Sequence, residues 1–309
     1  MKIGAIVNPV SGRGKARGLW PAIAAVLAAE GAKLDIRETA GDGDAVRLAR
    51  GFADGSVDLV IAVGGDGTIG AAAAGILGST RPATDFSFVA AGTGSDFARN
   101  FAPAPDPRAY AERLLSAPAV PVDAGVMTCE GEDGRALTRH FINIASFGVS
   151  GPIVRAVNGG RRGRVLPGTP VFFLHSVSQL LRYRPRCVGL RLDGIDLFQG
   201  PITAVAVSNG RWFGAGMQVA PKASLSDGLF DVVVIRGART VSLLNVMNRL
   251  YSGAHVDHPL VSIHRAGRVE VWPTRTDRSM AALIETDGEA PGRVPARFDV
   301  LPGAVRLKI

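Results

Sequence analysis

Short apolar runs and helix-like stretches alternate along the first part of the chain. The apolar runs are short enough to favour strands over helices, and they cover residues 2–7, 33–39, 59–64 and 86–91. The helix-like stretches cover residues 15–30, 43–53 and 107–117, with an Ala-rich stretch from residue 68. This alternation predicts an α/β domain, a parallel sheet with helices on both faces. The run 2–7 has no cleavage site and leads into Asn8-Pro9, so we expect a first strand rather than a secretory signal.

The hydrophobic pattern changes after Pro118. Short runs separated by turn residues predict strands at residues 120–127, 136–144, 188–192, 202–207, 229–235, 261–263, 269–272 and 282–284. Two helix-like stretches interrupt them, at residues 171–183 and 241–254. This half therefore predicts a mostly antiparallel β domain. We place the domains at residues 1–122 and 123–302.

The strand at 59–64 runs into a glycine-rich corner, Gly64-Gly65-Asp66-Gly67-Thr68. A strand, a tight turn and a helix start bring backbone N–H groups together on an anion, and glycine lets the main chain approach a phosphate. Asp66 would repel a phosphate unless a cation or a transferable proton lies between them. Thr68 can cap the helix or donate to a phosphate oxygen. An ordinary corner with Asp66 as the cap is the simpler alternative.

Two further loops follow predicted strands with related chemistry. The segment Gly92-Thr-Gly-Ser-Asp-Phe-Ala-Arg99 again supplies glycines, hydroxyls and an aspartate. The loop Asn8–Lys15 offers glycines and two cations, but Ala16 stands where a Walker A motif has Ser or Thr. In open α/β sheets ligands bind beyond the carboxyl ends of the strands. Together these loops favour a phosphate site.

Composition and charge narrow the classes of protein. The chain has 309 residues, 47% of them apolar, which is enough for two globular domains. Two cysteines are too few for a disulfide framework, and no apolar run reaches the roughly 18 residues of a membrane span. We therefore expect a cytoplasmic protein. The net charge of +8 favours an anionic partner, but the aromatic content of 6% and the absence of known motifs argue against nucleic acid.

Basic clusters at residues 161–164 and 182–186 flank an apolar segment at 171–174. A solvated charged edge is the simplest explanation of either cluster. The combination leaves open a peripheral contact with an anionic bilayer.

Two acidic turns in the second half carry candidate chemistry. The segment Ala220–Asp231 contains Asp227, which can cap its own turn or help to hold a hard cation such as Mg²⁺. The segment Ile284-Glu285-Thr286-Asp287-Gly288-Glu289 places three carboxylates in one tight turn. That number exceeds what a surface turn needs, and it suits a general base.

Five motifs in this order resemble the bacterial diacylglycerol kinase-like lipid kinases, relatives of the sphingosine and ceramide kinases. They are Asn8-Pro-Val-Ser-Gly12, Gly64-Gly-Asp-Gly-Thr68, Gly92 to Arg99, Ala220-Pro221 with Ser226-Asp-Gly228, and Asp287-Gly-Glu289. The second motif is shared with NAD kinases and sets only the superfamily. The resemblance extends over nearly the whole chain. It implies an N-terminal nucleotide-binding α/β domain, a C-terminal β-sandwich and an active site between them, with residues 303–309 returning to the first domain.

The resemblance also implies roles for individual residues. ATP contacts would come from Asn8, Val10, Ser11, Gly12, Arg13, Gly14, Thr39, Gly64, Gly65, Asp66, Gly67, Thr68, Ile69, Gly70, Ala71, Gly92, Thr93 and Ser95. Asp66 and Asp96 would help to hold the catalytic Mg²⁺, and Asp287 or Glu289 would be the general base. A structural Mg²⁺ would be held by Asp227 with the carbonyls of Ser224 and Leu229. Ser95 and Ser226 depart from the asparagine and aspartate usual in the family.

The expected function is transfer of the γ-phosphate of Mg·ATP to a membrane lipid hydroxyl, most simply that of diacylglycerol. A kinase of a soluble substrate such as NAD is one alternative, and a non-catalytic regulator that binds lipid or nucleotide is another. The sequence leaves a homodimer open and does not identify the lipid acceptor.

Overall fold

The computed structural model describes residues 1–92, 94–104, 106–159, 178–238, 240–274 and 281–309. The chain forms two compact units, one of Met1–Ala124 with Pro302–Ile309 and one of Gly125–Leu301. The chain passes from one unit to the other within strands β5 (Val120–Gly131) and β14 (Glu289–Leu307). No helix in the described ranges is both long and apolar enough to span a lipid bilayer.

The first unit is built on four parallel strands in the order β2-β1-β3-β4. Its elements in chain order are β1 (Lys2–Val7), η1 (Ser11–Gly14), α1 (Lys15–Ala29), β2 (Lys33–Glu38), α2 (Asp44–Asp54), β3 (Leu59–Gly64), α3 (Asp66–Leu77), β4 (Asp85–Ala90), η2 (Ala98–Asn100) and α4 (Pro107–Ser116). The last residues of β14 extend this sheet beside β4, where Leu307 pairs in parallel with Phe86. The predicted strands and helices of this part therefore lie where the sequence placed them.

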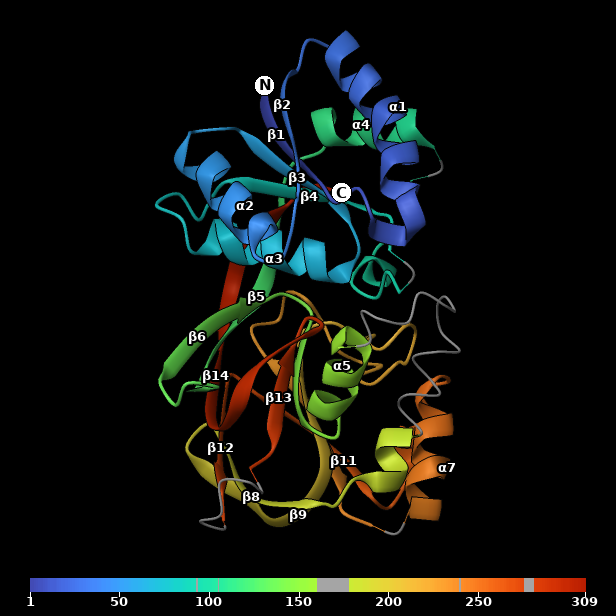
Figure 1. Cartoon of the computed structure of the whole chain (residues 1–309), viewed down its shortest axis with the longest axis vertical. Coiled ribbons are helices and arrows are strands. Elements are labelled where there is room, and N and C mark those ends of the chain that lie inside the picture. Colours follow the sequence, from blue (N-terminus) through green and yellow to red (C-terminus); the bar gives the residue numbers. More distant parts are fainter. Residues whose placement is uncertain (93, 105, 160–177, 239, 275–280) are drawn as a thin grey trace. The chain divides into compact units, whose positions relative to one another are not determined.

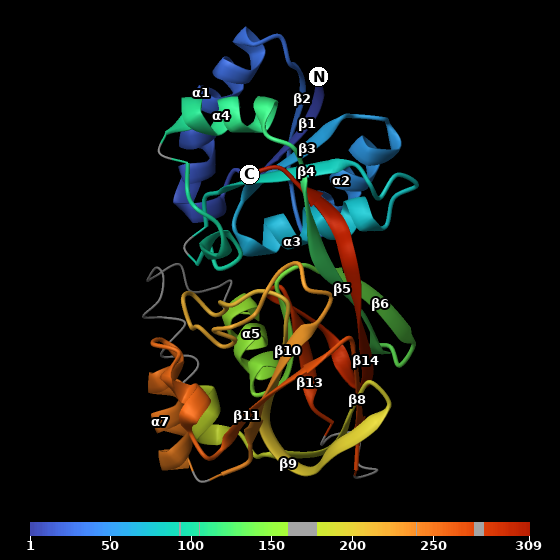
Figure 2. The ribbon, with the colours of Figure 1, turned by 180° about the vertical axis from the view of Figure 1, so that it is seen from behind.

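Helices pack on both faces of this parallel sheet (Figures 1 and 2). On one face, α1 and α4 share a core with alternate residues of the strands, such as Ile3 and Ala5 of β1. On the other face, Gly4 lies against the ring of Phe52 in α2, where an added Cβ would be 2.5 Å from the ring. Burial on both faces explains why all six residues of β3 are apolar or glycine. Helix α4 begins where Asp106 accepts a hydrogen bond from Ala109 N–H at 2.8 Å.

Nine strand pairs among the described residues of the second unit are antiparallel: β10 with β11 and β9, β12 with β14 and β8, β13 with β14 and β7, β5 with β6, and β9 with β7 and β8. After β5, its elements are β6 (Ala136–Phe141), β7 (Ile144–Gly148), α5 (Ser150–Gly159), β8 (Arg186–Leu192), β9 (Ile195–Ser208), β10 (Phe230–Arg236), α7 (Thr240–Leu250), η3 (Ala254–Asp257), β11 (Val261–Ala266), β12 (Arg268–Pro273), β13 (Leu283–Thr286) and β14. Val232 and Val234 of β10 face a core shared with β8, β12 and β14, whereas Val233 faces a second core with α7.

Three elements of the second unit differ from the prediction. The run 136–144 is two strands, because the N–H groups of Ile142 and Asn143 donate to Asp287 instead of continuing the ladder. Helix α5 was not predicted. The 19-residue strand β14 was also missed, because its prolines and glycines argue against a strand. Of the predicted helix 171–183, residues 178–183 are described; residues 178–182 are helical and Tyr183 is not.

Candidate functional site

Three loops of the first unit meet beyond the carboxyl ends of its parallel strands. They follow the adjacent strands β1, β3 and β4. A Cβ added at Gly12 would lie 1.7 Å from the Ala91 carbonyl oxygen, and one added at Gly92 would lie 2.6 Å from Gly65 Cα. Side chains at these glycines would hold the loops apart. The three predicted phosphate loops therefore form one continuous surface.

The first loop has a conformation that suits an anion. Gly12, Arg13 and Gly14 have φ angles of 56°, 62° and 89°, a left-handed turn in which successive N–H groups point the same way. Asn8 ties this loop to the next one, because its Nδ2 donates to Thr68 Oγ1 at 2.9 Å and its Oδ1 accepts from Val10 N–H at 3.3 Å. Thr39 follows β2 at the same edge, with its N–H bonded to the Val7 carbonyl at 3.0 Å.

Helix α3 begins at the second loop. Gly65 is its N-cap and Asp66 its first residue, so the carboxylate lies at the positive end of the helix dipole. The option that Thr68 caps the helix is wrong, because Thr68 is buried in the first turn and bonds to Asn8. Ile69 is fully buried and donates to the Gly65 carbonyl at 3.0 Å. Helix α3 thus continues through Ile69, Gly70 and Ala71, behind the corner formed by residues 64–68.

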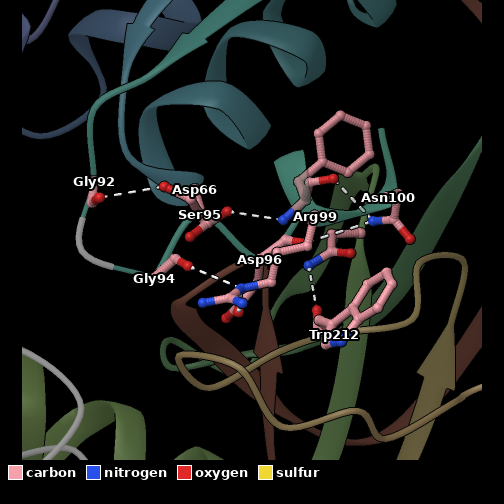
Figure 3. A network of polar contacts seen from close by, with 10 residues as sticks. Asp66, Gly92, Gly94, Ser95, Asp96, Arg99, Asn100 and Trp212 are labelled. Atoms are coloured by element: carbon pink, nitrogen blue, oxygen red, sulfur yellow. Dashed lines mark hydrogen bonds and ion pairs between the residues drawn. The ribbon is translucent and has the colours of Figure 1, made fainter. Parts of the chain in front are cut away.

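The second acidic corner contacts the first (Figure 3). Asp66 Oδ1 accepts from Phe97 N–H at 3.0 Å, so the loop after β4 is fixed to the start of α3. Asp96 is 5% exposed and lies 3.5 Å from the Arg99 guanidinium. Ser95 has a φ of 51° and donates to the Gly92 carbonyl at 3.2 Å, so a hydroxyl closes the turn where the family has an amide. Thr93 lies outside the described residues.

In the second unit, the Asp287–Glu289 turn is held by backbone donors. Asp287 accepts from the N–H groups of Ile142 at 2.9 Å, Asn143 at 3.2 Å and Ile144 at 3.1 Å. Three donors engage most of the acceptor sites of a carboxylate. Glu289, two residues on, is exposed.

Sequence reasoning gave no role to Glu285, which the structure places beside this turn. Its side chain accepts from Ser146 Oγ at 2.6 Å and from Gly288 N–H at 2.7 Å. Burial raises the pKa of Glu285 to about 7, and the nearby charge of Asp287 adds to the effect. The sequence of strand β13 does not indicate that the Glu285 carboxyl group points into the protein.

Both halves of the chain match known families. Residues 2–127 match the diacylglycerol kinase catalytic domain, and residues 143–309 match the YegS C-terminal NAD kinase beta sandwich-like domain. The chain is 31% identical to a Chromohalobacter salexigens protein named "Probable lipid kinase YegS-like", over 90% of this chain and 84% of that one. The chain belongs to the diacylglycerol kinase-like lipid kinases. It is 29% identical to a diacylglycerol kinase of Mycobacterium tuberculosis, over 99% of this chain and 94% of the relative.

The fold agrees with this family. A crystal structure described as a diacylglycerol kinase from Bacillus anthracis superposes with a TM-score of 0.72 at 22% identity, over 99% of this chain and 96% of that one. The chain is thus a kinase with an N-terminal catalytic domain and a C-terminal β-sandwich domain, and the resemblance expected from its motifs is confirmed.

Both carboxylate oxygens of Asp227, the predicted ligand of a structural Mg²⁺, have hydrogen-bond partners within the protein. Asp227 accepts from Leu229 N–H at 3.2 Å with one oxygen and from the Arg265 guanidinium with the other. Arg265 also pairs across the strands with Asp231, which is 4% exposed and whose pKa burial raises. A guanidinium therefore lies against the carboxylate that was expected to hold the cation. Among the described residues, no cluster of three or more His, Cys, Asp or Glu side chains is arranged to hold a metal.

Proposed function

We propose that this lipid kinase transfers the γ-phosphate of Mg·ATP to the hydroxyl of diacylglycerol, giving phosphatidic acid. The observation that carries the proposal is the convergence of three glycine-rich loops at one edge of a parallel sheet. Relatives of nearly the same length in M. tuberculosis and Bacillus subtilis are named diacylglycerol kinases, which supports the choice of acceptor.

The helix-flanked parallel sheet is the nucleotide-binding domain of this proposal. The N–H groups of the Gly12–Gly14 turn and the start of α3 bind the phosphates, with Arg13 adding positive charge. Asp66 and Asp96 are suited to hold a catalytic Mg²⁺ together with the phosphates, since Mg²⁺ is usually held by one or two carboxylates plus substrate oxygens. When bound, Mg²⁺ neutralises charge that develops during transfer.

The Asp287–Glu289 turn acts on the acceptor hydroxyl. Asp287 is committed to three backbone N–H groups, so its role is to fix the turn. Glu289, two residues after Asp287, is exposed and takes the proton from the lipid hydroxyl as the general base. The two roles follow from the three hydrogen bonds of Asp287 and from the exposure of Glu289.

The lipid acceptor brings the protein to a membrane surface as a peripheral cytoplasmic enzyme. Leu181 is 56% exposed and is followed by exposed Arg182 and Arg184, a combination of apolar and basic groups that suits an anionic bilayer. The other predicted basic cluster, 161–164, and the apolar segment 171–174 lie outside the described residues.

Transfer of labelled γ-phosphate from Mg·ATP to a panel of acceptors tests the proposal. The panel contains diacylglycerol, sphingosine and an extracted lipid mixture in mixed micelles, with NAD as the soluble acceptor. Labelled phosphatidic acid is the expected product. Label in another lipid would refute the acceptor, whereas label in NAD alone would refute lipid phosphorylation. ATP binding without transfer to any acceptor would favour a regulator.

A further inference from the structure

We propose that Glu285 is a positioning residue that fixes the Asp287–Glu289 turn through the Gly288 N–H group, and that its ionised form is the competent one. The inference rests on the proposed role of this turn in lipid phosphorylation. Glu285 itself lies behind the turn and is 5% exposed, so it touches no substrate.

The turn is clamped from two sides. Asp287 and Gly288 both have left-handed φ angles, 45° and 91°, a conformation that glycine adopts freely and that aspartate adopts more readily than most other residues. On one side, the backbone donors of residues 142–144 hold the Asp287 carboxylate. On the other side, Glu285 Oε1 accepts from Gly288 N–H at 2.7 Å and closes the turn across three residues. The two clamps fix the residue that precedes Glu289.

The second oxygen of Glu285 meets a chain of hydroxyl groups. Glu285 Oε2 lies 2.6 Å from Ser146 Oγ on β7, and Ser146 Oγ lies 2.9 Å from Ser150 Oγ at the start of α5. When Glu285 is ionised, Ser146 donates to it and both carboxylate oxygens act as acceptors. When Glu285 is protonated, it donates to Ser146, and Ser146 then donates to Ser150. Both patterns are satisfied, so the fold tolerates either state.

The charge state changes the strength of the clamp. A hydrogen bond from an N–H group to a carboxylate is about twice as strong as one to a neutral carbonyl. Gly288 is therefore held more firmly when Glu285 is ionised. Burial places the pKa of Glu285 at about 7, so this change occurs near neutral pH.

Few other ionisable groups face this carboxyl group. On its own turn, Asp287 raises the pKa of Glu285. Strand β7 has no ionisable residue, and Arg155 of α5 pairs with Glu132. On β14, Glu289 is opposite Thr286, the residue after Glu285, and Arg293 is opposite Leu283, two residues before Glu285.

The test compares Glu285→Gln, Glu285→Ala and the control Glu270→Ala, a carboxylate on β12 away from this turn. Two readouts are used, the protection of the Gly288 amide against hydrogen exchange and the pH dependence of kcat and of KM for the lipid and for ATP. Glutamine can accept from Gly288 N–H and donate to Ser146 Oγ but stays neutral at every pH, whereas alanine removes the Glu285 acceptor of Gly288 N–H.

We expect Glu285→Ala to lower Gly288 protection and kcat by about tenfold or more, with KM for ATP unchanged. The wild-type kcat should rise between about pH 6 and pH 8 through an ionisation that Glu285→Gln abolishes. Glu270→Ala should match the wild type in both readouts.

An unchanged Gly288 protection in Glu285→Ala, or an unchanged pH profile in Glu285→Gln, would overturn the inference. If the wild type transfers phosphate to no acceptor, the proposed function fails, and the exchange measurement alone still decides whether Glu285 holds the turn.

Discussion

Replacing Gly12 with alanine tests whether the first loop must touch the end of β4. The added Cβ would lie 1.7 Å from the Ala91 carbonyl oxygen, although real Cβ atoms essentially never approach other heavy atoms within 3.0 Å. The loop must therefore retreat by more than 1 Å. The left-handed φ of 56° adds a cost of about 1 kcal/mol for any residue with a Cβ.

Gly14→Ala is the matched control, because Gly14 has a left-handed φ of 89° but nothing within 4 Å of an added Cβ. We expect Gly14→Ala to lower the free energy of unfolding by about 1 kcal/mol and to weaken ATP binding less than Gly12→Ala does, because it keeps the N–H group and meets no neighbouring atom. Gly12→Ala should cost about 2–3 kcal/mol, since it adds a backbone collision to the same conformational cost. It should also weaken ATP binding about tenfold or more, because phosphate contacts depend on sub-ångström placement.

Urea unfolding and calorimetric titration with Mg·ATP measure the two effects. Equal losses of stability and affinity in both variants would refute the reasoning, because the collision at Ala91 would then have no consequence. A destabilised Gly12→Ala protein with normal ATP affinity would remove this loop from the phosphate site.

Three other predictions concern the second unit. The pKa of Glu285 is raised from 4.5 to about 7, so between these pH values the folded protein keeps a proton that the unfolded chain releases. The free energy of unfolding should therefore fall by about 3 kcal/mol as pH rises through this range. In urea unfolding of Glu285→Gln, this dependence of the unfolding free energy on pH should be absent. Asp287→Ala leaves three backbone N–H groups without their acceptor and should cost about 3 kcal/mol or more in urea unfolding, whereas Asp287→Asn should cost less. Because Arg265 neutralises Asp227, the Tm of the nucleotide-free protein should be the same in Mg²⁺ and in EDTA. A Tm that rises with Mg²⁺ would show that a cation displaces the guanidinium.

The acidic corner around Asp66 could be predicted because its signals are local. A buried strand, glycines and a helix start follow one another in the sequence, and parallel strands bring such corners to the same edge. The clamp on Asp287 could not be predicted. Its donors are backbone N–H groups 143 to 145 residues away, and these have no side-chain signature.

The same limit applies to the two carboxylates whose neighbours were not foreseen. Arg265 lies 38 residues after Asp227, and only the pairing of β10 with β11 brings its strand to that turn. The inward direction of Glu285 depends on the register between β13 and β7, where Glu285 is opposite Ser146. Strand β14 was missed for a local reason, because its three prolines, Pro291, Pro295 and Pro302, are unusual within a strand.

The most direct test of the account is the rate of labelled phosphate transfer from Mg·ATP to diacylglycerol by the wild type and by Asp66→Asn. Asparagine keeps an acceptor for Phe97 N–H but removes the charge, so the fold should persist. We predict labelled phosphatidic acid with the wild type and a rate lower by about 100-fold or more with Asp66→Asn, at an unchanged free energy of unfolding. A variant that transfers phosphate at the wild-type rate would contradict the assignment of this corner as the catalytic centre.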